Sequence, residues 1–258
     1  MNPGRRSLLA LTSVLLAVSF ASSVHAESFW AQKKVISRKI PIRNACVMPV
    51  EADITKIGVK TSESMPKESD AWATALQGFL ETQFRMVGIG VSSATNPLSS
   101  GASDQELREA VQQIQQKFDA LSELLGKRPR EIAKNAYTLG DQVAMLPCAA
   151  NSDVLVIIRG AGAVPTVGRQ TMAFAGGALV EDGALVNITF ADAKSGEILA
   201  MIRFRNADQF LTYEKGKYLV ADEEQAFGRP LLDGFADINL GSARKLREKL
   251  DFGPSPIE

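Results

Sequence analysis

After residue 44 the hydrophobic pattern of the chain alternates between two periods. Short apolar or alternating runs predict β-strands, at residues 45–50, 89–93, 153–159, 185–190 and 197–204. Apolar residues at helical spacing predict helices at residues 69–87, 103–125 and 130–146, and a last helix that begins at Asp222. The order β-α-β-α-α-β-β-β-α predicts an α/β fold with a layered mixed sheet.

The segment 103–146 carries the clearest helical pattern. Ser103 and Glu106 fit a capping box. The apolar residues that follow are spaced 4, 3, 4, 3 and 4 apart, and they are Leu107, Val111, Ile114, Phe118, Leu121 and Leu125. Such a narrow stripe is typical of a seam between helices. A second stripe over 130–146 follows a break at 126–129, so the two stripes predict a helical hairpin.

We expect this hairpin to project from or cap the α/β body and to form an interaction surface. The residues of that surface would be Leu107, Val111, Ile114, Phe118 and Leu121. The alternative is that both stripes cover the sheet, in which case the same residues belong to the core.

The remaining segments are predicted to be irregular. Residues 51–68 contain Gly58 and Pro66 and are expected to form a loop. Residues 160–183 are rich in glycine and alanine and are interpreted as a long insertion. Residues 27–44 form a basic, extended lead-in, and 242–258 form a basic and then disordered tail. A single α/β domain is expected over 45–241.

The first 26 residues have the three parts of an export signal. Arg5 and Arg6 precede an apolar core at 8–20, and Val24-His25-Ala26 offers small residues at the two positions that a signal peptidase reads. We therefore expect a cleaved signal peptide at 1–26 and a mature chain that works in the periplasm of a bacterial cell. An uncleaved membrane anchor is the alternative. No cysteine stands at the cleavage point, so no lipid anchor is expected.

Removal of that segment changes the composition in two ways. The whole chain has 29 basic and 29 acidic residues, and the segment takes two arginines with it, so the mature part is slightly acidic and gives no reason to expect a nucleic-acid partner. The only histidine, His25, also leaves. Its loss excludes histidine-dependent triads and histidine-ligated zinc or haem from the mature chain. We expect no catalytic residue, no cofactor and no metal.

Two cysteines remain, Cys46 and Cys148. An even pair in an oxidising compartment is expected to be bridged. The first and third predicted strands can lie side by side and parallel, which would bring the two cysteines together. Two free thiols are the alternative, although no C-x-x-C motif supports a redox role.

Three segments resemble a known superfamily of bacterial envelope proteins. They are the strand and proline at 46–52, Ser152-Asp153 before the strand 154–156, and the turn Asp192-Ala193-Lys194-Ser195-Gly196-Glu197. The superfamily groups the curli-secretion lipoproteins with the N-terminal domain of the periplasmic Tol-system protein. The likeness implies a fold over most of 44–240 and carries no catalytic residues. The lipidated cysteine of the secretion-channel members is missing here.

These observations favour an exported, non-enzymatic binding or assembly module of the cell envelope. Its partner would be another envelope protein or a second copy of the chain. One alternative is an oligomeric pore-associated subunit in which 160–183 contacts the membrane. A second alternative is a histidine-independent hydrolase, although the acidic pairs Glu181-Asp182 and Glu223-Glu224 are sequence neighbours that seldom converge on one substrate.

Overall fold

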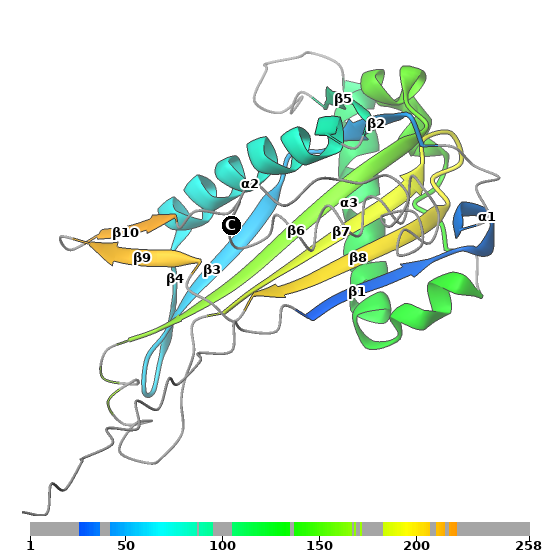
Figure 1. The fold of residues 1–258 in the computed structure, drawn as a ribbon. Coiled ribbons are helices and arrows are strands. Elements are labelled where there is room, and N and C mark those ends of the chain that lie inside the picture. The colour runs from blue at the N-terminus through cyan, green and yellow to red at the C-terminus, as the bar shows by residue number, and fades with distance from the viewer. Residues whose placement is uncertain are drawn as a thin grey trace, which may run out of the picture.

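One large mixed sheet organises the molecule (Figure 1). The computed structural model describes residues 26–36, 42–86, 88–94, 105–134, 137–166, 168, 171, 183–206, 210–214 and 217–220. The main path of the sheet runs, in spatial order, through β1 (Ala26–Ala31), β8 (Ile198–Asn206), β7 (Gly183–Asp192), β6 (Val154–Pro165), β2 (Asn44–Val47) and β5 (Gly90–Ser93). The predicted α/β fold with a layered mixed sheet is confirmed.

The sheet changes character at β6. From β6 through β7 and β8 to β1 the strands are antiparallel, whereas β2 pairs with β6 and with β5 in parallel. Further along β6, β3 (Glu51–Ile57) replaces β2 as the parallel neighbour of β6. On its other side β3 pairs with β4 (Ser62–Ser64) in the antiparallel direction. The predicted loop at 51–68 is therefore wrong, because its first seven residues are β3 and β4 follows.

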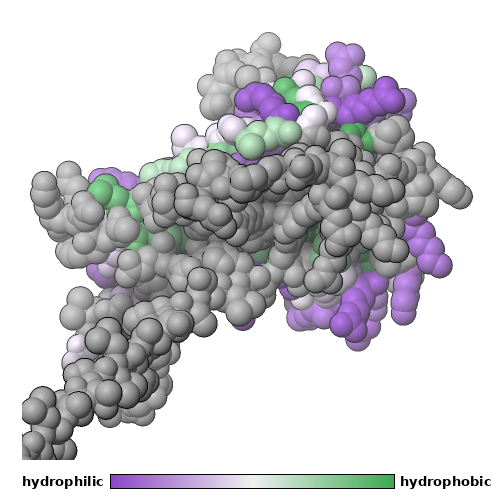
Figure 2. Space-filling view, viewed as in Figure 1, coloured by the Kyte–Doolittle hydropathy of each residue, from purple (hydrophilic) through white to green (hydrophobic). Residues whose placement is uncertain are grey.

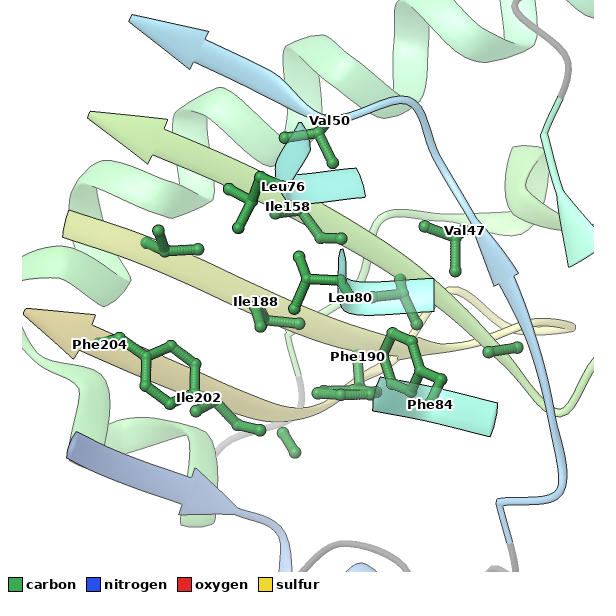
Figure 3. Packing of buried hydrophobic residues seen from close by; sticks show 14 of the residues in the cluster. Val47, Val50, Leu76, Leu80, Phe84, Ile158, Ile188, Phe190, Ile202 and Phe204 are labelled. Atoms are coloured by element: carbon green, nitrogen blue, oxygen red, sulfur yellow. The ribbon is translucent and has the colours of Figure 1, made fainter. Parts of the chain in front are cut away.

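Helix α2 (Pro66–Met86) covers one face of the sheet (Figure 3). It does so because Trp72, Leu76, Leu80 and Phe84 recur every four residues and thus share one side of the helix. All four are fully buried, against strand residues such as Ile188. The helix begins before the predicted Ser69, whose hydroxyl donates to the Met65 carbonyl and accepts from the Ile54 amide.

Helix α3 (Gln105–Lys127) crosses the other face (Figure 1). Four of its buried residues pack into a second cluster with strand residues such as Leu155, Ile157 and Met201, and these four are Val111, Ile114, Phe118 and Leu125. Hydrophilic residues gather in Figure 2 where Figure 1 draws α3 and the short helices beyond the sheet. Among the described residues, no helix is both long and apolar enough to cross a membrane.

The chain beyond α3 does not form the second helix predicted at 130–146. Two short 3-10 turns take its place, η1 (Pro129–Ala133) and η2 (Asp141–Met145), and a third, η3 (Pro147–Asn151), follows. Gly140 has a φ of 89°, which interrupts a right-handed helix. The prediction of a helical hairpin is therefore wrong. Ile132, Leu139 and Val143 are nevertheless fully buried, as the apolar pattern indicated.

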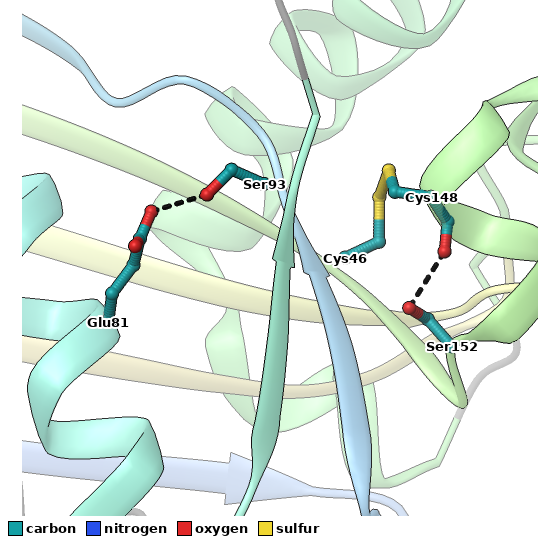
Figure 4. The surroundings of a disulfide bond; sticks show 5 residues. All are labelled: Cys46, Glu81, Ser93, Cys148 and Ser152. Carbon is teal, nitrogen blue, oxygen red and sulfur yellow. Dashed lines mark hydrogen bonds between the residues drawn. A yellow bond between two sulfur atoms is a disulfide. The ribbon is translucent and has the colours of Figure 1, made fainter.

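The disulfide joins Cys46 on β2 to Cys148 in η3 (Figure 4). The Cα atoms lie 5.3 Å apart. The predicted pairing and its reason are confirmed, since β2 and β6 are parallel neighbours and η3 leads into β6. The Ser152 hydroxyl donates to the Cys148 carbonyl at 2.8 Å, which ties η3 to the start of β6.

Three remaining elements are short. Helix α1 (Lys33–Ile36) follows β1, and β9 (Leu211–Glu214) pairs with β10 (Lys217–Val220). The predicted lead-in at 27–44 thus starts as an edge strand. In the predicted insertion, residues 160–165 complete β6, while most of 167–182 lies outside the described residues, as do residues 1–25, the last predicted helix and the tail.

Candidate ligand-binding cavity

A polar row crosses the sheet beneath α3. Arg159 on β6 is paired with Asn187 on β7, and Asn187 is paired with Arg203 on β8. Directly paired residues share a face of the sheet, and side chains alternate along each strand. Ile157 and Met201, two residues from the arginines, belong to the core under α3. The polar row therefore lies on the α3 face.

A cavity of about 430 Å³ opens between α3 and this row. Its lining combines charged, polar and apolar side chains. The lining residues are Phe118, Asp119, Ser122, Leu125 and Gly126 from α3, and Arg159, Leu185, Asn187, Thr189, Met201 and Arg203 from the sheet. Ligand pockets in proteins usually start at about 300 Å³ and combine an apolar lining with a few fixed polar groups. The cavity under α3 exceeds that volume and has fixed polar groups, and its lining is a mixture of polar and apolar side chains.

The charge of Arg159 is already neutralised by carboxylates of the protein. Arg159 forms ion pairs with Glu51 of β3 and with Asp119 of α3, the latter at 3.4 Å. Its guanidinium also lies 5.3 Å from the centre of the Phe118 ring. Gln115 donates to Glu51 at 2.8 Å and adds a second link from α3 to β3. Two carboxylates thus balance this one cation, and its role is to hold α3 on the sheet.

Arg203 has a different environment. Its Nε donates to the Asn187 side-chain oxygen at 2.9 Å, and Nη1 donates to the Gly126 carbonyl at 3.5 Å. The guanidinium lies 5.4 Å from the centre of the Trp30 ring. Among the described residues it has no carboxylate partner. Burial, and then the neighbouring positive charge of Arg205, lower the pKa of Arg203. An arginine nevertheless stays charged near neutral pH, so an unbalanced cation faces the cavity.

The residues predicted as an interaction surface belong to the protomer's own core. Ile114 is fully buried, and Val111 and Phe118 are 5% and 2% exposed. Leu107 and Leu121 are partly buried against the same cluster. That interpretation is therefore corrected. The narrow stripe faces the sheet because the strand residues opposite supply the rest of the apolar contact. Two of its residues, Phe118 and Leu125, also line the cavity.

The predicted turn at 192–197 is structural. The Asp192 carboxylate accepts from the Lys194 and Ser195 amides at 3.0 and 2.8 Å. Glu197 accepts from Gln32 at 3.0 Å and pairs with Lys34. The bonds from Lys34, and then from Gln32, lower the pKa of Glu197 despite partial burial. These contacts fix the β7–β8 turn against the segment that follows β1.

Other chemistry is sparse in the described part of the chain. It contains no group of three or more cysteine, histidine or acidic residues placed to hold a metal ion. Asp153 accepts from the Arg43 and Asn44 amides at 2.8 and 2.9 Å, and so holds the start of β2.

Comparison of the sequence with protein-family models and with curated proteins finds no match. The structure is similar to that of a neuraminyllactose-binding hemagglutinin homolog from Helicobacter pylori, at 9% identity and a TM-score of 0.33, covering 83% of this chain and 88% of that one. It is also similar to a PelC dodecamer from Paraburkholderia phytofirmans, at 8% identity and a TM-score of 0.32, covering 83% and 97%. Likenesses at this level establish neither a shared fold nor a shared function.

Proposed function

We propose that this chain is an exported, non-enzymatic binding module of the bacterial cell envelope, with the cavity under α3 as its ligand site. The observation that carries the proposal is Arg203. Taking a guanidinium out of water without an opposite charge is costly, so proteins usually pair such a group. Here the group is half-buried on the floor of a cavity, with only neutral partners among the described residues.

The sequence supports the same proposal independently. The segment 1–26 has the features of an export signal, and the mature chain would contain no histidine. The motifs at 46–52, 152–156 and 192–197 resemble those of envelope proteins. Their side chains hold strands and turns together, as Asp153 and Asp192 do. That role is compatible with a binding scaffold.

Thermal unfolding of the purified protein against a panel of anionic, neutral and cationic small molecules tests this function. We expect at least one class to raise the melting temperature in wild type and to lose that effect when Ser122→Trp fills the mouth of the cavity. Ser122 is exposed on α3 and lines the cavity, so the protein should still fold. A panel without any stabilising compound, or turnover of a bound compound, would contradict the proposal.

A further inference from the structure

Resting on the proposed function, we infer that the ligand is a small carboxylate with one negative charge and an apolar body. Its carboxylate would lie against Arg203 and Asn187, and its apolar part would lie between α3 and the sheet. Charge, donor geometry and the cavity lining each lead to this class of ligand.

Charge limits the ligand to a single negative group. Arg203 is the one cation of the polar row without a carboxylate partner among the described residues. Arg159, across the row, already has Glu51 and Asp119 beside it. A phosphate or sulfate dianion would meet those two carboxylates with only one uncompensated guanidinium in its favour. Counted with the neighbouring Arg205, the row has three positive charges against these two carboxylates, so a monoanion balances the site.

Donor geometry favours a carboxylate among monoanions. Nε and one N–H of Nη1 are used inside the protein, which leaves donors on both terminal nitrogens of Arg203. A guanidinium is planar and matches the two oxygens of a carboxylate. Because the Asn187 oxygen accepts from Arg203, its amide NH₂ is a neighbouring donor, without an acceptor among the described residues. The Trp30 ring lies 5.4 Å from the guanidinium and adds a contact that holds it in place.

The residues that line the cavity indicate the chemistry of the part of the ligand beyond its carboxylate. Leu185 and Met201 line the cavity from the sheet, and Phe118 and Leu125 line it from α3. These side chains offer no hydrogen bonds, so an apolar part of the ligand would pack against them, beside the polar Asp119, Ser122 and Thr189 of the same lining. Benzoate is thus a suitable probe, and benzamide is its uncharged counterpart of nearly the same shape.

Isothermal titration of the purified wild-type protein compares benzoate, benzamide and inorganic phosphate at constant ionic strength. We expect saturable binding of benzoate, at least tenfold weaker binding of benzamide, and no displacement of benzoate by phosphate. This comparison needs no variant. Arg203→Gln should weaken benzoate binding at least tenfold, whereas Arg85→Gln, at an exposed arginine on α2, should leave it unchanged.

The outcomes separate the two proposals. Benzamide or phosphate binding as tightly as benzoate would overturn the carboxylate assignment, as would an Arg203→Gln protein that is folded and binds benzoate like wild type. In each case a stabilising effect that Ser122→Trp still abolishes would keep the cavity as a ligand site. If instead no compound of the thermal-unfolding panel stabilises the protein, the proposed function itself fails.

Discussion

Two backbone segments touch at Gly196. Its φ is 68°, and a Cβ there would come within 2.4 Å of the Gly140 carbonyl oxygen. The contact joins the β7–β8 turn to the segment before η2, and the Leu139 amide donates to the Gly196 carbonyl at 2.8 Å. A side chain is excluded at this position both by the backbone angle and by the neighbouring chain.

Gly196→Ala should therefore destabilise the protein by at least about 1–3 kcal/mol, the typical cost of a strained backbone conformation. Chemical denaturation measures the change. Gly78→Ala is the matched control, because Gly78 lies on the exposed side of α2 with no atom within 4 Å of an added Cβ. That change should stabilise by about 0.5–1 kcal/mol. Equal effects of the two substitutions would contradict this account of the turn.

Glu197, the next residue, should make the free energy of unfolding depend on pH in the acidic range. Its bonds from Lys34 and Gln32 lower its pKa below the usual 4.5. A lowered folded pKa means stability that is present above pH 4.5 and is lost as the pH falls through the folded value. Glu197→Gln should lose that contribution, so its deficit against wild type should shrink on acidification. Unfolding free energies measured over this range test it, and a deficit independent of pH would refute it.

At the scale of elements, α3 is held on the sheet by its stripe and by the ion pair between Asp119 and Arg159. Phe118 contributes to both, since it is 2% exposed and lies beneath the Arg159 guanidinium. The helix is thus part of the fold and also one wall of the cavity. Any change that loosens α3 should therefore affect binding as well as stability.

Phe118→Ala should cost about 3–5 kcal/mol, as expected for a large side chain removed from a core. Thermal and chemical unfolding measure the loss. Leu124→Ala on the same helix is the control, because Leu124 is 37% exposed and its removal should stay within about 0.5 kcal/mol. A stable Phe118→Ala protein would place the stripe outside the core.

Periodicity predicted most elements because it reports burial. It succeeded for α2, α3, β6 and the β7–β8 hairpin, where regular structure and burial coincide. It failed at 130–146, where 3-10 turns bury residues at similar intervals. It also missed β3, whose only fully buried side chain is Ile54.

The cavity could not be predicted in the same way. Side chains alternate between the two faces of a strand, so the sequence alone places Arg203 and Arg205 on the same face. The meeting of Arg159, Asn187 and Arg203 depends on the register between three strands. No pattern within one strand specifies that register.

At the scale of the whole molecule, the disulfide connects two parts of the chain 102 residues apart. A cross-link of that span restricts the unfolded chain strongly. Cys148→Ser should lower the unfolding free energy by about 2–5 kcal/mol, and reduction of wild type should have nearly the same effect. Denaturation with and without reductant measures both. Unchanged stability in the variant would show that the bridge does not contribute.

The central claim is that the space between α3 and the sheet binds a ligand. Amide chemical-shift mapping of the isotopically labelled protein, titrated with a compound that stabilises it, tests this most directly. The account predicts that the largest shifts fall on Gly126, Asn187 and Arg203 and their neighbours, with little change on the exposed side of α2. Shifts centred on α2 or on β9 and β10, with the α3 cavity unperturbed, would contradict it.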